Sequence, residues 1–217
     1  DSINAIGKRI TTFEIEFQRF ILSEFLTHKM LSRNGASSRA IPVSKVLELV
    51  RNDPAMPSSW GKNQAGMQAK EELTGIDLES VKEDWLSAAD MAAAFSESMS
   101  TNNAHKQIAN RITEPFQWMK VVVTATEWNN CWHLRDHTDA QPEIQVLFHE
   151  MKRQYDLKEN VTFLKPGEWH LPYVNIKFDC IDGNTTIYTD TEGTILTEEE
   201  ALMVSASCCA QASYRKL

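Results

Sequence analysis

Hydrogen-bond donors crowd one short stretch of the sequence, "THKMLSRNGASSR" at residues 27–39. The stretch combines a histidine, a lysine, two arginines, an asparagine and three serines beside an apolar segment. Arginine binds phosphate through two parallel N–H bonds, and serine hydroxyls and backbone N–H groups can add further donors. The composition therefore fits phosphate binding, although a polar connection whose serines cap helices would use the same residue types.

The overall composition limits the kinds of protein to which this stretch can belong. With 217 residues, of which 42% are apolar, the chain can bury one sizeable core, and we expect a single domain over residues 1–217. Its net charge of −8 gives no general attraction for nucleic acid, so an anion site must be local. No apolar run or signal-peptide pattern predicts a membrane segment, and the four cysteines do not resemble a disulfide framework. We therefore expect a cytoplasmic protein that binds neither membranes nor nucleic acids.

The donor stretch must be held by the elements around it. Apolar spacing predicts a helix over residues 14–32, which would end at Asn34-Gly35. A second helix should begin near Pro42, followed by a loop rich in Pro, Gly and Ser over residues 52–67. In this interpretation the donors lie where one helix ends and the next begins.

The middle of the chain is also predominantly helical by its pattern. Residues 78–99 form a long Ala-rich segment typical of a helix, and residues 102–112 and 140–156 predict two more helices. The β-branched run at residues 118–128 fits either a buried strand or a helix segment, because periodicity alone cannot separate them.

The C-terminal part has the composition of strands followed by a helix. Turn residues Asp182-Gly183 and Glu192-Gly193 divide residues 173–196 into a small sheet. Thr197, with Glu200 three residues later, predicts a capping box at the start of the last helix. The fold class is therefore α+β, rich in helices, with a small antiparallel sheet.

The donor stretch resembles the signature of flavin-dependent thymidylate synthases, Arg-His-Arg-x-x-Ser-x-Asn-x-x-Ser-x-Arg. The positions that match in identity and spacing are His28, Ser32, Asn34, Ser37 and Arg39. Lys29 keeps the charge of the second arginine, and Thr27 replaces the first.

Two later segments resemble the same family in the same order. "HKQIANRITEP" is similar to a stretch with a substrate-binding arginine four residues before a proline, which places Arg111 before Pro115. Residues 124–144 are similar to a stretch that reads Asn-x-Arg…Asn…Leu-Arg…Ala-Gln-x-Glu-Ile, with Thr124 and Thr126 in place of the first Asn and Arg. The matching positions are Asn130, Leu134, Arg135, Ala140, Gln141, Glu143 and Ile144. The resemblance covers about residues 14–150.

The last helix extends the resemblance in an unusual order. "SASCCAQASY" is similar to a segment that usually lies near the family's N-terminus, which implies a permuted branch. The family's flavin-contacting Ser-Pro-Phe-Glu-His segment would then follow Leu217, so we expect a chain truncated there or a site without that wall.

The resemblance implies a reductive methylation of deoxyuridine monophosphate (dUMP) at C5. In the family, methylenetetrahydrofolate supplies the carbon, reduced FAD supplies the hydride, and NADPH reduces the flavin again. The family assembles as a homotetramer, so we expect an oligomer. The alternative is a divergent member that modifies another pyrimidine nucleotide, or that binds a nucleotide without flavin catalysis.

Residue roles follow from the resemblance. Arg135 would stabilise negative charge at the N3/O2 edge of the pyrimidine, and it is a catalytic candidate together with Ser37. The nucleotide-binding candidates are Glu24, Ser37, Ser38, Arg39, Arg111 and Arg135. The cofactor-binding candidates are Thr27, His28, Lys29, Asn34, Thr124, Thr126 and Asn130. Glu24 should lie one helical turn before His28 on the same face.

Each of these residues also has a structural interpretation that needs no ligand. Arg111 and Arg135 could be surface arginines on helices, and His28 could be a half-buried histidine with satisfied hydrogen bonds. Cys131, His133 and His137 have a C-x-H-x3-H spacing, with the histidines one helical turn apart. Zinc requires three or four ligands, so we predict no metal site. Trp128 and Trp132 are expected in the core or in a subunit interface.

Overall fold

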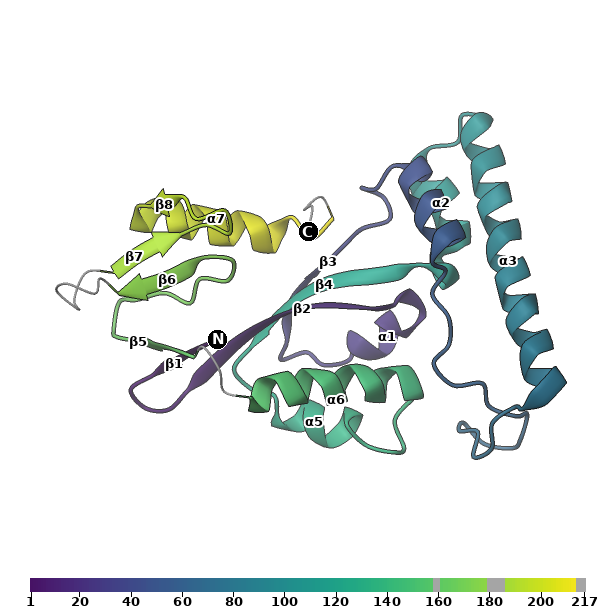
Figure 1. Cartoon of the computed structure of the whole chain (residues 1–217), viewed down its shortest axis with the longest axis horizontal. Helices are drawn as coiled ribbons and strands as arrows, with labels where there is room; N and C mark the ends of the chain where they lie inside the picture. Colours follow the sequence, from purple (N-terminus) through teal and green to yellow (C-terminus); the bar gives the residue numbers. More distant parts are fainter. Residues whose placement is uncertain (158–160, 179–185, 214–217) are drawn as a thin grey trace.

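The computed structural model describes residues 1–157, 161–178 and 186–213, and the fold is α+β as predicted. A five-stranded sheet in the order β3-β4-β2-β1-β5 lies at the centre of the molecule, and a three-stranded sheet lies to one side of it (Figure 1). Helices α1, α5 and α6 lie along one side of the large sheet, and α2 and α3 lie beyond its end. The large sheet is the element that the sequence did not predict.

Strand β2 (Arg9–Gln18) replaces the first part of the helix expected over residues 14–32. It pairs antiparallel with β4 (Trp118–Ala125), which settles the ambiguous run at residues 118–128 as a strand. Phe13, Ile15 and Phe17 alternate with glutamates, and this period of two is the signal of a strand with one buried face. Helical structure begins only in the 3-10 helix η1 (Arg19–Ile21) and continues in α1 (Leu22–Phe25).

The predicted helix stop at Asn34-Gly35 is also wrong, because these residues belong to strand β3 (Ser32–Gly35). This strand pairs antiparallel with β4, so that Asn34 faces Val122 and Ser32 faces Thr124. The donor stretch thus runs along the edge of the large sheet. Residues 32–35 are held on one side only, by their pairing with β4.

The main core fills the space between the large sheet and the helices α5 (Asn129–Arg135) and α6 (Pro142–Asp156). Phe17 and Val123 from the sheet pack with Phe148 from α6, and all three are almost completely buried. Trp128 and Trp132 stack with ring centroids 5.2 Å apart and are buried there too, as expected for core residues.

A second apolar cluster joins the helices beyond the end of the sheet. It lies between α2 (Val43–Asn52), α3 (Gly75–Thr101) and the 3-10 helix η2 (Asn110–Phe116), which follows the short α4 (Lys106–Ala109). These elements confirm the helix expected to begin near Pro42 and the helix expected over residues 78–99. The helix expected over residues 102–112 begins only at Lys106 and continues with 3-10 geometry in η2. Within the described residues, no helix has both the length and the apolar character needed to cross a membrane.

The C-terminal part follows the sequence prediction closely. Strands β6 (Asn175–Phe178), β7 (Thr186–Thr189) and β8 (Ile195–Leu196) form an antiparallel sheet, and helix α7 (Glu198–Ala210) begins with the predicted capping box. The turn at Glu192-Gly193 joins β7 to β8, whereas Asp182-Gly183 lies outside the described residues. Strands β1 (Ser2–Asn4) and β5 (Thr162–Leu164) complete the large sheet as a parallel pair.

Candidate functional site

Three residues predicted from two separate motifs meet at the end of α5. The Nε of Arg135 donates a hydrogen bond to Nε2 of His28 at 2.9 Å, and its Nη2 donates to Oγ1 of Thr27 at 3.0 Å. Arg135 is half-buried, His28 is buried, and the His28 ring packs on Phe148 of the core. The guanidinium is therefore held in one orientation with part of its edge accessible.

The electrostatics of this group keep His28 neutral. Burial lowers the pKa of His28, and the positive charges of Arg135 and Arg33 lower it further. Since Nε2 accepts the hydrogen bond from Arg135, the single ring proton belongs on Nδ1. Arg33 itself donates to the carbonyl oxygens of Leu26, His28 and Leu31, so it shapes the turn around His28 rather than offering itself to a ligand.

Two expected helical relationships are wrong. Helix α1 ends at Phe25, so Glu24 and His28 do not lie one turn apart on one helix face, and Glu24 accepts a hydrogen bond from its neighbour Ser23. Helix α5 ends at Arg135, so His133 and His137 do not share a helix. Among the residues that the structure describes, no group of three His, Cys, Asp or Glu side chains could hold a metal ion.

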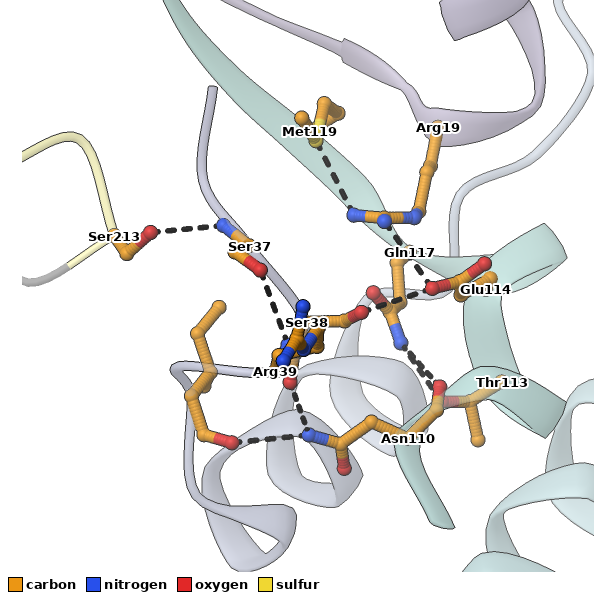
Figure 2. Close-up of polar contacts among 11 residues, drawn as sticks. Arg19, Ser37, Ser38, Arg39, Asn110, Thr113, Glu114, Gln117, Met119 and Ser213 are labelled. Carbon is orange, nitrogen blue, oxygen red and sulfur yellow. Dashed lines mark hydrogen bonds and ion pairs between the residues drawn. The ribbon is translucent and has the colours of Figure 1, made fainter. Parts of the chain in front are cut away.

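A second group forms around the turn that follows β3 (Figure 2). The buried Ser38 donates from Oγ to Oε1 of Glu114 at 2.8 Å, and its carbonyl oxygen accepts from the Asn110 amide at 2.7 Å. Asn110 also donates to the carbonyl oxygen of Ile41 at 2.9 Å, and Lys106 donates to that of Ala40 at 2.8 Å. Residues 38–41 are therefore fastened to α4 and η2 mainly through their carbonyl oxygens. The sequence analysis missed Asn110 and Glu114, which lie on either side of the predicted Arg111.

Both arginines predicted to bind phosphate belong to this second group. Arg39 follows Ser38 and Arg111 follows Asn110, so the bond between Ser38 and Asn110 joins the two segments that carry them. Both side chains are exposed, and neither guanidinium makes a hydrogen bond or ion pair within the described part of the chain. Two cations without partners on joined segments favour the binding of an anion.

Two further candidates of the donor stretch contact the C-terminal segment instead. The side-chain amide of Asn34 donates to the carbonyl oxygens of Cys209 and Ala210, each at 2.9 Å, at the end of α7. The backbone N–H of Ser37 donates to Oγ of Ser213 at 2.8 Å, and Oγ of Ser37 accepts from the N–H of Arg39. Residues 209–213 thus lie against the edge that carries the predicted nucleotide contacts.

The remaining cofactor candidates fall into two sets. Thr124 bonds with Thr12 at 2.6 Å, and Thr12 bonds with the ring of His170 at 2.9 Å. His170 lies outside all three motifs, lines a cleft of about 420 Å³, and was not predicted. By contrast, Lys29, Thr126 and Asn130 are exposed, and their side chains make no hydrogen bond with any other described residue.

The available side chains fit a flavin in chemical type. Thr126 and Asn130 lie before and at the start of α5, and Lys29 follows His28, which contacts the last residue of that helix. A hydroxyl, an amide and a cation are suitable partners for the polar edge of a flavin and for its anionic reduced form. Thr27, Asn34 and Thr124 have hydrogen bonds inside the chain, so only part of the predicted set is free.

The cysteine nearest to Arg135 is not suited to attack a substrate. Burial raises the pKa of the Cys131 thiol to about 11, which keeps it protonated at neutral pH. Cys131 is buried and free of any disulfide. Any chemistry at this group must therefore proceed without a Cys131 thiolate.

Comparison with known proteins gives a family and two similar structures. The family described as thymidylate synthase complementing protein matches residues 9–158. The UMP/dUMP methylase PolB from Streptomyces cacaoi, solved with 5-Br dUMP, is 15% identical, with a TM-score of 0.55 over 68% of this chain and 67% of that chain. The same methylase solved with 5-Br UMP is 14% identical, with a TM-score of 0.55 over 68% of each chain. No curated protein gives a significant match.

Proposed function

Because the chain belongs to the thymidylate synthase complementing protein family, it is a thymidylate synthase-like methyltransferase, and we propose that it methylates dUMP at C5. The observation that carries the substrate proposal is the pair of exposed arginines, Arg39 and Arg111, on segments joined by the bond between Ser38 and Asn110. The similar fold of a methylase solved with 5-Br dUMP and with 5-Br UMP supports a pyrimidine nucleotide as the substrate class.

The phosphate end of the nucleotide is assigned to the turn after β3. Arg39 and Arg111 supply positive charge to a dianionic phosphate in a protein of net charge −8. Ser37 can contribute its hydroxyl, and Ser38 holds the turn in place through Glu114. A phosphate that also takes the N–H of Ser37 must displace Oγ of Ser213 from it.

The base end is assigned to Arg135. C5 can attack a one-carbon unit only when the pyrimidine ring is made electron-rich, and a fixed guanidinium at the N3/O2 edge stabilises the negative charge of that activated form. His28 and Thr27 hold the guanidinium in place, and the neutral imidazole adds no competing charge. Arg135 therefore orients the ring and lowers the energy of its charged form.

The family is generally flavin-dependent, and we extend this to the present chain as part of the proposal. A bound flavin would supply the hydride that converts the transferred one-carbon unit to a methyl group. Lys29, Thr126 and Asn130 would hold the flavin, while methylenetetrahydrofolate and NADPH would act as co-substrates. The absorption spectrum of the purified protein after dialysis against buffer tests this part. A protein that shows no flavin absorbance after incubation with FAD and a further dialysis would contradict it.

We also propose that the chain assembles as a homotetramer. Helix α3 has an exposed apolar face that includes Ile76 (85% exposed), Met91 (60%) and Phe95 (57%), which is typical of a surface covered by another subunit. Light scattering coupled to size-exclusion chromatography measures the mass, and a monomer at micromolar concentration would contradict the assembly.

Calorimetric titration with dUMP and UMP tests the central proposal. We expect binding by the wild type and a loss of about tenfold or more in affinity for Arg39→Ala and for Arg111→Ala, because each removes a charged hydrogen bond to phosphate. Arg51→Ala is a matched control, since this exposed arginine pairs with Glu97 on α3. Unchanged affinity in both site variants would overturn the phosphate assignment.

A divergent role remains the second candidate. Thr27, Asn34 and Thr124 are predicted flavin contacts whose side chains already have hydrogen bonds within the chain. A protein that binds the nucleotide with the affinity expected here but takes up no flavin would favour this role over the first.

A further inference from the structure

A carboxylate to which the family resemblance assigned no role lies beside the proposed phosphate-binding turn. Oε1 of Glu114 accepts hydrogen bonds from Oγ of Ser38 at 2.8 Å and from Nη2 of Arg19 at 3.2 Å (Figure 2). The side chain of Glu114 is 26% exposed and that of Arg19 is 16% exposed. One oxygen atom therefore links the turn after β3 to the residue that follows β2.

The position of Glu114 in η2 places it close to the proposed ligand. Side chains three residues apart in a 3-10 helix lie one above the other, so Glu114 and Arg111 share one side of η2. Through Ser38, Glu114 also holds the residue directly before Arg39. Glu114 therefore lies in the same 3-10 helix as Arg111 and is hydrogen-bonded to the residue before Arg39.

Two effects of opposite sign follow from this placement. A carboxylate near a phosphate repels it, which would weaken nucleotide binding. Holding the turn in one conformation, however, strengthens binding, because less conformational freedom is then lost when the ligand binds. Arg19 reduces the repulsion, because its positive charge neutralises Glu114 locally. Its side chain donates to Sδ of Met119 and its backbone N–H donates to the carbonyl oxygen of Gln117, so its position is fixed.

We propose that Glu114 is a positioning residue for nucleotide binding, which acts through Ser38 on the conformation that Arg39 and Arg111 require. The inference rests on the proposed function, because it concerns the affinity of that same site. Asn110 and Lys106 hold the carbonyl oxygens of the turn, whereas Glu114 is the group that holds the Ser38 side chain.

Two substitutions at position 114 separate positioning from charge repulsion. Glu114→Ala removes the bond to Ser38 and the negative charge, whereas Glu114→Gln removes the charge but keeps an oxygen that can accept from Ser38. We expect calorimetry with dUMP to give about tenfold weaker binding for Glu114→Ala and binding within about threefold of wild type for Glu114→Gln. If repulsion dominates, both variants bind more tightly and by similar factors, and the proposal is overturned.

A variant on the other side of the bond guards against misfolding at position 114. Ser38→Ala removes the same hydrogen bond without a change of charge and should weaken binding by a factor similar to that of Glu114→Ala. The double variant should then be little weaker than either single variant, because both remove one interaction. Fully multiplicative losses would show that Glu114 and Ser38 act independently, which overturns the proposal.

The remaining controls distinguish this inference from the proposed function. Glu71→Ala also removes a carboxylate paired with a cation, Lys62, in the loop that precedes α3, and should leave the affinity unchanged. If the wild type binds neither dUMP nor UMP, the proposed function fails and this inference fails with it. If the wild type binds and Glu114→Ala binds equally well, only the positioning role is refuted.

Discussion

Substitution of Arg135 by alanine should reduce turnover far more than nucleotide affinity. A guanidinium has five N–H donors, and since His28 and Thr27 use two of them, three remain for a substrate. Those two bonds fix the guanidinium before the substrate arrives, so its charge acts without reorganisation. A preorganised donor of this kind typically contributes about 3–4 kcal/mol to transition-state stabilisation, which corresponds to a loss of about 10²–10³ in turnover.

The affinity for dUMP should change much less, because the ring becomes an electron-rich nucleophile only in the chemical step and not in the bound ground state. Release of tritium from C5-labelled dUMP, with flavin, methylenetetrahydrofolate and NADPH supplied, measures turnover, and calorimetry measures affinity. Arg135→Lys should restore little, since an ammonium group cannot contact His28, Thr27 and the ring edge together. Arg153→Ala is a suitable control, because this exposed arginine of α6 pairs with Glu150 on the same helix.

A titration of His28 by NMR gives a second readout that does not depend on activity. Loss of the Arg135 charge should raise the pKa of His28 toward its ordinary value, although burial will still hold it below that value. Near-normal turnover in Arg135→Ala would refute the catalytic assignment even if the pKa of His28 rises. Arg135 would then be a residue that only shapes the turn around Thr27 and His28.

Three further predictions concern the elements around the site. Burial lowers the pKa of His170 to about 4, so the unfolded state takes up a proton first as the pH drops. The free energy of unfolding should therefore fall between about pH 6.5 and pH 4. His170→Gln should reduce this loss by no more than about 2 kcal/mol, measured by urea denaturation at pH 7 and pH 4.5. Asn34→Ala should expose the end of α7 to faster hydrogen exchange, because two carbonyl oxygens lose their donor, and unchanged exchange there would contradict this. Thr197→Ala should lower the free energy of unfolding by about 1 kcal/mol through loss of the capping box, measured by chemical denaturation followed by circular dichroism.

The sequence did not predict the backbone that carries the first part of the donor stretch and the residues before it. Residues 13–25 satisfy two periodicities, since Phe13, Ile15 and Phe17 alternate while Phe17, Ile21 and Phe25 follow helical spacing. The chain changes from strand to helix at Gln18, and no glycine or proline marks the change. The central sheet was therefore missed, although the strand run at residues 118–128 was recognised as one of two possibilities.

The partners of the motif residues could not be predicted, because they lie far away in the sequence. Asn34 contacts Cys209, 175 positions later, and Arg19 contacts Glu114, 95 positions later. Residue type and spacing report local structure, whereas these pairs depend on how the large sheet packs against α7 and η2. His170 is the clearest case, since no motif surrounds it and only the folded chain brings it to Thr12.

The arginines around the proposed site differ in how many hydrogen-bond partners they have within the chain. Arg33 lies inside the donor stretch, yet it donates to three carbonyl oxygens and has a structural role. The guanidinium of Arg19 donates hydrogen bonds to Glu114 and to Sδ of Met119. Arg39 and Arg111 have no such partner among the described residues, even though the protein carries an excess of carboxylates that could have neutralised them. Both side chains are exposed on segments joined by the bond between Ser38 and Asn110, and this arrangement is the reason that we propose them as the phosphate ligands.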